Sequence, residues 1–243
     1  MTPTSYPASF KSAHVRARIV KILLIVGAVA TGISVLAGAL SLGFPLSEDQ
    51  ELAENPVGAV IVLMEVLLAV VELALYFATV VFFCVWLYRA YDNLRAFNQW
   101  SRLEYSPGWA VGSFFVPFVN LVIPYRAVRE VWQKSGPPDD ALLSEPSPPA
   151  TFPVWWTFWL LASFAGNISM RASFNENVAE STSTVISIVA GCLSIVAALL
   201  AYLVVDAIDD RQEETSRKIK LGKFSAPPPP PANLPMPDVV ATS

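Results

Sequence analysis

Two carboxylates within one apolar stretch are the residues of this chain whose type and position best suit a chemical role. Glu65 and Glu72 interrupt the otherwise apolar segment 57–88, and their spacing of seven places them on one face of a helix. A carboxylate inside a bilayer costs about 2.5–3.5 kcal/mol on insertion scales, and it is a functional candidate by default. Both residues are therefore candidate intramembrane sites.

Depth separates the two carboxylates. Counting back from Trp86 at the end of the apolar segment, a helical rise puts Glu72 roughly 21 Å and Glu65 roughly 31 Å away. Glu72 is therefore the buried and costly one, whereas Glu65 reaches the opposite headgroups. Glu72 must be protonated, hydrogen-bonded to a neighbouring helix, or directed toward a polar cavity or a cation. The first two alternatives predict a structural role, and the last predicts an ion or proton role.

Other chemistry is poorly supported by the sequence. The chain has one histidine, His14, and two cysteines, Cys84 and Cys192, that both sit in apolar runs. This set favours neither a disulfide framework, a metal site nor a Ser-His-Asp triad. Phosphate-loop and dinucleotide glycine patterns are missing from the sequence. We expect no catalytic residues, no metal and no cofactor, and a net charge of -4 argues against binding nucleic acid.

The composition indicates lipid as the solvent. Hydrophobic residues make up 54% of the chain and charged residues 15%, against about 25% charged in soluble domains. Spanning helices need roughly 20 apolar residues. Four segments meet or approach this length: about 22–44, 57–88, 153–170 and 184–205. The first could be a cleaved signal peptide, because a basic lead precedes it, but its apolar stretch exceeds the usual signal core of about 7–15 residues.

A fifth stretch, 108–134, must be assigned by counting charges. The chain has 16 Lys and Arg residues. If the stretch turns back, all of them except Arg171 lie on the same side of the membrane as both termini. If it crosses, the basic residues divide evenly between the two sides. Cytoplasmic loops carry an excess of Lys and Arg, so the sequence predicts that the stretch turns back on the cytoplasmic side.

Prolines define how this stretch turns. Pro117 and Pro124 each remove a backbone donor, and a turn near Asn120 is tolerated when it is buried or lines a wet cavity. We expect 108–124 to be a re-entrant or an interfacial hairpin, two alternatives that the sequence leaves open. A surface helix, 124–134, should follow, with weak pairs between Glu130 and its neighbours Arg126 and Lys134.

The expected fold class is an all-α integral membrane protein with four transmembrane helices, a cytoplasmic-side hairpin and an amphipathic helix. Residues 1–18 are expected to form a cytoplasmic tail, 19–210 the membrane domain, and 211–243 a charged helix end followed by a proline-rich tail. Helical spacing predicts that the second span continues past Trp86 toward Trp100.

Two sequence motifs resemble a known family. The stretch "WLYRAYDNL" followed by "YSPGWAVGSFFVPFVNLVIPYRAVREVW" resembles bacterial membrane proteins of domain of unknown function 4328. The resemblance covers roughly 57–210 and implies a multi-span inner-membrane protein without an assigned activity. Its matching positions are Trp86, Arg89, Asn93, Pro107, Gly108, Trp109, Pro117, Asn120, Pro124, Tyr125, Glu130 and Trp132.

The function that these features favour is a non-catalytic scaffold or regulator of the inner membrane, with a cytoplasmic surface that binds an unknown protein partner. The alternative is a small oligomeric transporter or channel component that uses Glu72 and the re-entrant hairpin. Small residues at four-residue spacing in the first and last spans allow close helix packing. That packing occurs within one bundle or, alternatively, in a homo-oligomer.

Overall fold

The computed structural model describes residues 10–43, 56–97, 103–136 and 146–221. Within these residues every regular element is a helix, which confirms the all-α prediction for this part of the chain. Half of the predicted N-terminal tail, residues 1–9, and the proline-rich part of the C-terminal tail lie outside the described residues. The elements are α1 (His14–Gly43), α2 (Pro56–Asp92), η1 (Asn93–Arg95), α3 (Pro107–Gly112), η3 (Ser113–Phe115), η4 (Val119–Leu121), α4 (Ile123–Lys134), α5 (Thr151–Ser173) and α6 (Glu180–Lys220).

Among the described residues, three helices are long and apolar enough to cross a membrane. They are α1, the stretch Leu63–Arg95 that α2 and η1 form together, and α6. Large apolar side chains on their outer faces are exposed, as at Leu63 and Val70 of α2, and a helix that is apolar all round suits a bilayer. Three predicted spans therefore match. The fourth, 153–170, lies within α5, whose 23 residues extend roughly 34 Å, and its crossing stays a prediction.

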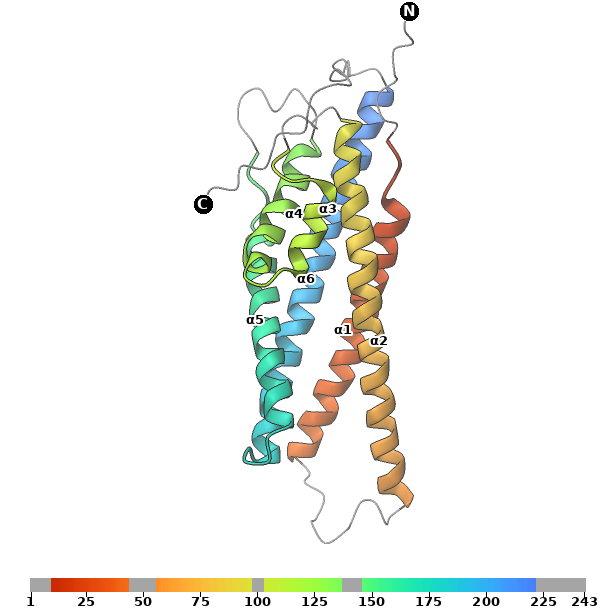
Figure 1. Cartoon of the computed structure of the whole chain (residues 1–243). Coiled ribbons are helices and arrows are strands. Elements are labelled where there is room, and N and C mark those ends of the chain that lie inside the picture. Colours follow the sequence, from red (N-terminus) through yellow and green to blue (C-terminus); the bar gives the residue numbers. More distant parts are fainter. Residues whose placement is uncertain (1–9, 44–55, 98–102, 137–145, 222–243) are drawn as a thin grey trace, which may run out of the picture.

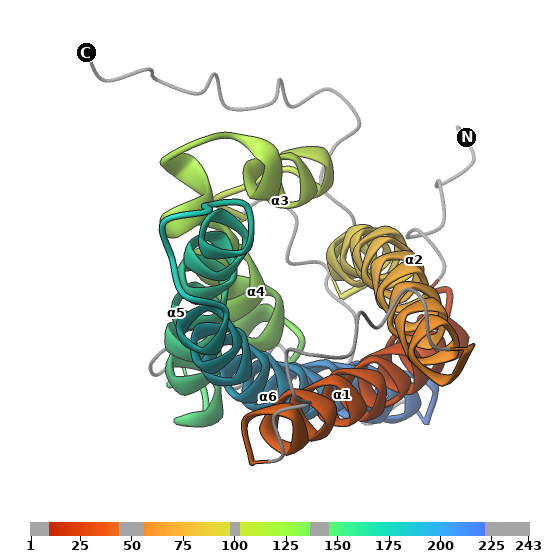
Figure 2. The same cartoon turned by 90° about the horizontal axis from the view of Figure 1, so that it is seen from below.

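The four long helices run side by side along the long axis of the molecule (Figure 1). Seen from below, they follow an arc in the order α2, α1, α6 and α5 (Figure 2). The ends of the arc, α2 and α5, stand apart in this view, and α3 lies across the space between them. The short helices α3 and α4 pack at one end of the bundle, which we call the hairpin end; it is uppermost in Figure 1.

Glycines let α1 and α6 approach closely. A Cβ built on Gly191 of α6 would lie 2.5 Å from Val35 Cγ2, and one on Gly38 of α1 would lie 3.4 Å from Thr184 Cγ2. Ala30 and Ala190 are buried in the same pair of helices. The predicted small-residue faces thus pack within the chain, in keeping with close-approach helix interfaces.

The hydrophobic core is concentrated at the hairpin end. There the last turns of α2 meet α4, the first turns of α5 and the middle of α6, and their apolar side chains are fully excluded from solvent. The predicted continuation of the second span is confirmed as far as Arg95. The fully buried members include Trp86, Leu87, Tyr91, Leu94, Val128, Val131, Phe152, Val204 and Ile208.

The turn of the hairpin lies at Pro117 and Phe118. Phe118 adopts a positive φ of 64°, and the Asn120 backbone N–H donates to the Val116 carbonyl at 3.0 Å. A nearby carbonyl, that of Leu121, accepts from the Trp156 indole N–H at 3.0 Å. A tryptophan of α5 therefore satisfies this backbone group.

The helix α4 buries a residue for which the sequence predicts only weak pairs along the helix. The carboxyl group of Glu130, expected to pair with Arg126 and Lys134, lies within the protein and is reached by donors outside α4. Val128 and Val131 are also fully buried against the chain. The physical reason is that α4 presents one face to α2, where a tyrosine donor is available; helix spacing alone does not reveal that neighbour.

Candidate functional site

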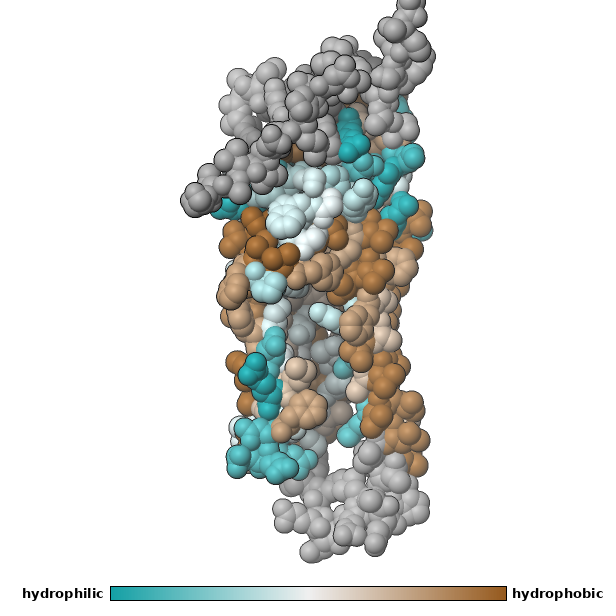
Figure 3. All heavy atoms as spheres, viewed as in Figure 1, coloured by the Kyte–Doolittle hydropathy of each residue, from teal (hydrophilic) through white to brown (hydrophobic). Residues whose placement is uncertain are grey.

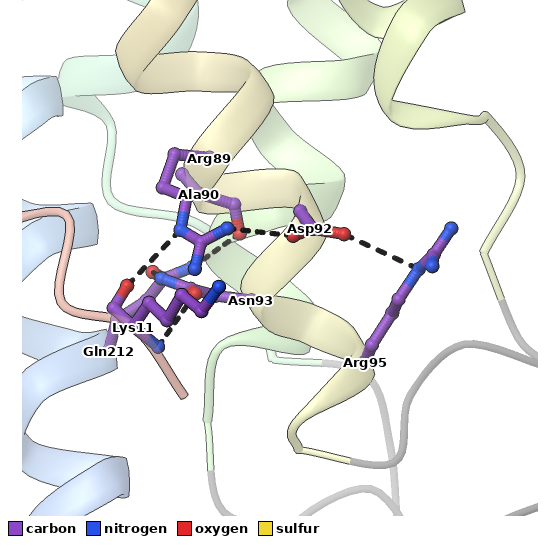
Figure 4. A network of polar contacts seen from close by, with 7 residues as sticks. All are labelled: Lys11, Arg89, Ala90, Asp92, Asn93, Arg95 and Gln212. Carbon is purple, nitrogen blue, oxygen red and sulfur yellow. Dashed lines mark hydrogen bonds and ion pairs between the residues drawn. The ribbon is translucent and has the colours of Figure 1, made fainter. Parts of the chain in front are cut away.

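Buried polar side chains tie the helices together at the hairpin end. The Gln212 amide N–H groups donate to the Ala90 carbonyl at 2.8 Å and to Ser135 Oγ at 3.1 Å, and its carbonyl accepts from Asn93 Nδ2 at 3.1 Å. Thr215 Oγ1 donates to the Ser135 carbonyl at 2.8 Å. Figure 4 shows Gln212 and Asn93 meeting between α6 and α2. These residues, which we call the polar cluster, join α2, α4 and α6.

The polar cluster also fixes the direction of the hairpin. Asn93, which precedes the hairpin in sequence, and Ser135, which follows it, both contact Gln212. The backbone N–H of Glu104 donates to the Glu130 carboxylate at 2.5 Å, which joins the approach to the hairpin to the helix that leaves it. The chain thus enters and leaves this segment at the same end of the bundle.

The Arg89 side chain contacts other residues of the protein. Its Nη1 lies 2.9 Å from Asp92 Oδ2, and its Nε donates to the Lys11 carbonyl at 3.4 Å. Asp92 also contacts Arg95 Nε at 3.4 Å, as Figure 4 shows. The structure thus uses Arg89 to hold the chain before α1 against α2.

Glu130 is a buried carboxyl group with two donors. Tyr91 Oη donates to one carboxylate oxygen, and the Glu104 N–H donates to the other. Burial raises the pKa of Glu130, and these two hydrogen bonds partly oppose that rise. The pair links α2 to α4 at the centre of the core.

A histidine–aspartate contact and an ion pair join the start of α1 to the part of α6 around residues 206–209. His14 Nδ1 lies 2.7 Å from Asp209 Oδ2, and Lys21 Nζ lies 2.6 Å from Asp206 Oδ1. Sequence reasoning placed His14 in a tail and gave it no partner. The sequence did hold a signal for these contacts: acidic residues follow the last predicted span, and basic residues precede the first predicted span.

Arg211 of α6 lies over the ring of Trp132 of α4, with its Cζ 4.3 Å from the ring centroid. Gly136, two residues after α4, lies directly beneath this guanidinium, and a Cβ there would displace the end of the Arg211 side chain. A guanidinium stacked on tryptophan is a favourable cation–π pair. This contact makes Trp132, a motif residue, part of the α4–α6 interface.

The two intramembrane carboxylates have separate surroundings. The Ser34 hydroxyl of α1 donates to Glu72 Oε1 at 2.9 Å, so Glu72 is hydrogen-bonded to a hydroxyl on a neighbouring helix, one of the predicted alternatives. Glu72 also lines a cavity of about 720 Å³ with Tyr76 and Thr79. Glu65, one heptad earlier on α2, is exposed. The structure thus does not bring the two carboxylates together.

The remaining motif residues divide between the core and the hairpin. Pro107 is buried at the start of α3, where Ser106 caps the helix by accepting from the Trp109 N–H. Pro124 is buried in the first turn of α4, and the Tyr125 ring stacks against Trp156. Trp86 is fully buried. The other positions are Gly108, where a Cβ would meet open space, the partly exposed Trp109, and Pro117 and Asn120 at the turn.

The fold and this site define a class: a helical protein with apolar helices of membrane-spanning length and a polar framework at one end of the bundle. Among the described residues, no group of three or more His, Cys, Asp or Glu side chains could hold a metal ion. The chain belongs to the family described as domain of unknown function DUF4328, whose model matches residues 52–210. No curated protein and no solved structure matches the chain.

Proposed function

We propose that this protein is a multi-span bacterial inner-membrane protein that acts as a non-catalytic scaffold or regulator. In this proposal α5 is the fourth span, both termini are cytoplasmic, and the hairpin enters the bilayer from the cytoplasmic side and returns. The charge distribution supports this arrangement, because every basic residue of the sequence except Arg171 is then assigned to the cytoplasmic side. Exposed aromatic side chains at Trp109, Phe115 and Phe118 support contact of the hairpin with lipid.

One observation carries the proposal: the motif residues build a framework instead of lining a reaction site. Arg89, Asn93 and Glu130 all contact other segments of the chain at the hairpin end, Arg89 through the Lys11 carbonyl. A polar network whose members are paired holds its helices in one arrangement. Such a framework supplies a rigid cytoplasmic platform, and the outer faces of its helices are available to a partner.

The surface that we assign to the partner is the outer face of α4. Arg126 and Arg129 are exposed there, on the side opposite the buried Val128 and Val131. This basic face suits a protein with an acidic docking surface. Substitutions at Arg89 or Glu130 are poor tests of this interaction, since both residues support the fold.

Site-specific crosslinking in native membranes tests the surface directly. A photoreactive residue at Arg129 should capture one discrete protein, whereas the same probe at Arg217, an exposed basic residue on the last turns of α6, should not. Arg129→Glu should abolish copurification of that protein, and Arg217→Glu should leave it unchanged, with equal membrane insertion of both variants. Identical capture from both positions, or capture of lipid alone, would refute the proposal.

A second candidate function is a small oligomeric transporter or channel component that uses Glu72 and the hairpin. The observation that favours it is the cavity beside Glu72, which the hairpin residues Phe114 and Phe115 also line. Four spans without an internal repeat would require an oligomer. Full rescue of a deletion strain by Glu72→Gln would exclude ion coupling through this carboxylate, and loss of rescue would support it.

A further inference from the structure

We infer that the cavity beside Glu72 binds a hydrophobic organic cation, such as a quaternary ammonium or a lipophilic amine. This inference rests on the second candidate function for its biological meaning and names its ligand class. It is independent of the interaction surface on α4. The argument uses the size of the cavity, the chemistry of its walls and the direction in which it opens.

The cavity has the size of a ligand site. Its volume of about 720 Å³ falls within the range of roughly 300–1,000 Å³ that is typical of small-molecule pockets. Its walls come from α1, α2, α5 and α6, and Phe114 and Phe115 of the hairpin line it as well. Figure 3 shows the molecule hollowed between the α5 and α2 sides, below the hairpin.

The charge of the cavity favours a cation. Among the described residues that line it, Glu72 alone carries a formal charge, and neither lysine nor arginine is present. Ser34 holds Oε1 of this carboxylate through the 2.9 Å hydrogen bond. A carboxylate in an apolar surrounding is stabilised when a cation approaches it, and ionisable groups within spans commonly mark such pathways.

The walls favour an organic cation over a metal ion. Six aromatic side chains line the cavity, and aromatic faces attract ammonium groups through their quadrupoles. Hard metal ions instead require a set of oxygen ligands, typically about six to eight for Ca²⁺. The aromatic residues are Tyr76, Phe83, Phe114, Phe115, Trp155 and Trp159.

The direction of opening favours a hydrophobic ligand. The four long helices leave the α2 and α5 ends of their arc apart, and α3 crosses that space at the hairpin end (Figure 2). With the long helices spanning the bilayer, the hollow between α2 and α5 faces hydrocarbon. A cation with apolar substituents partitions into the bilayer and can enter from the side, whereas a hydrated inorganic ion pays a large desolvation cost there.

Equilibrium dialysis of the purified full-length chain in detergent tests this site with tetraphenylphosphonium. The matched control is Glu65→Gln, because Glu65 is exposed on the same helix, and the change in charge is the same. Wild type and Glu65→Gln should bind the probe saturably with equal Kd. Glu72→Gln should bind at least tenfold more weakly, a difference of about 1.4 kcal/mol. Tetraphenylborate, an anion of the same shape, should show no saturable binding to wild type.

Equal Kd values for wild type and Glu72→Gln would overturn the inference, as would saturable binding of tetraphenylborate. Glu72→Gln can still accept the Ser34 hydrogen bond, so its elution profile and thermal midpoint should match wild type. If it fails to fold, Tyr76→Leu decides the matter, because Tyr76 is an exposed wall residue outside the core. This variant should bind several-fold more weakly, and an unchanged Kd would refute the site. The assay contains no protein partner, so its failure leaves the α4 proposal standing.

Discussion

Removing the Gln212 side-chain amide should strongly destabilise the hairpin end. In Gln212→Leu the side chain keeps a similar volume but loses the contacts to Ala90, Ser135 and Asn93, which measure 2.8, 3.1 and 3.1 Å. A buried polar group left without a partner costs about 1–3 kcal/mol. At least the Asn93 amide loses its acceptor, and two further contacts disappear. We therefore expect a loss of about 3–5 kcal/mol in the free energy of unfolding.

The assay is thermal unfolding of the purified protein in one detergent, with Gln133→Leu as the matched control. Among the described residues, the Gln133 side chain makes one hydrogen bond, to the Pro146 carbonyl at 3.0 Å, and Gln133 is only partly buried. Its loss should cost about 0.5–1.5 kcal/mol. With roughly 2–4 °C per kcal/mol for a chain of this size, Gln212→Leu should lower Tm by on the order of 10 °C. Equal shifts for the two variants would refute the role of the polar cluster.

Two further predictions concern helix contacts. Gly191→Ala should lower the free energy of unfolding by about 1–3 kcal/mol, because its Cβ would meet Val35 Cγ2 at 2.5 Å. The control Gly32→Ala, which faces open space on α1, should raise it by up to about 1 kcal/mol. Thermal midpoints that shift in the same direction in both variants would contradict this packing. Tyr91→Phe should cost about 1.5–3 kcal/mol at pH 8 and less at pH 5. Because the folded pKa of Glu130 is raised, its contribution to stability is fully present below its unfolded pKa and is lost as pH rises through the folded value. The tyrosine donor opposes that loss by stabilising the charged form, so a cost independent of pH in melts at both values would contradict the assignment.

The parts of the fold that depend on local composition could be predicted from the sequence. Apolar runs identified α1, α2 and α6 as helices of spanning length, since hydropathy is a property of each segment by itself. The depth of Glu72 limited its alternatives, and a hydroxyl on a neighbouring helix was one of them. Helical spacing after Trp86 also indicated that α2 continues beyond the apolar run, as it does.

The contacts at the hairpin end could not be predicted, because they depend on which helices become neighbours. Gln212 meets Ala90 and Asn93 across more than a hundred residues of sequence, and His14 meets Asp209 across a still longer separation. Glu130 shows the same limit. Helix spacing offers it charged partners on its own helix, but tertiary packing provides a tyrosine hydroxyl and a backbone N–H in a buried site.

Burial also changes the choice of position for a topology test. Ser135 follows the hairpin and is therefore an obvious labelling site from the sequence, but it is fully buried and bonded to Gln212. Arg129 on α4 and Glu176 on the α5–α6 connection are exposed. The helix α4 packs at the hairpin end, and the α5–α6 connection lies at the other end of the bundle (Figure 1). The two residues make a matched pair for single cysteines in a chain whose Cys84 and Cys192 are replaced by serine.

Labelling that pair with an impermeant maleimide in intact cells is the most direct test of the proposed arrangement, in which the hairpin returns to the cytoplasmic side. The account predicts that Glu176→Cys reacts from outside at once, whereas Arg129→Cys reacts only after the inner membrane is permeabilised. Reaction of Arg129→Cys from outside in intact cells would contradict the account. It would put the α4 surface on the wrong side of the membrane for a cytoplasmic partner.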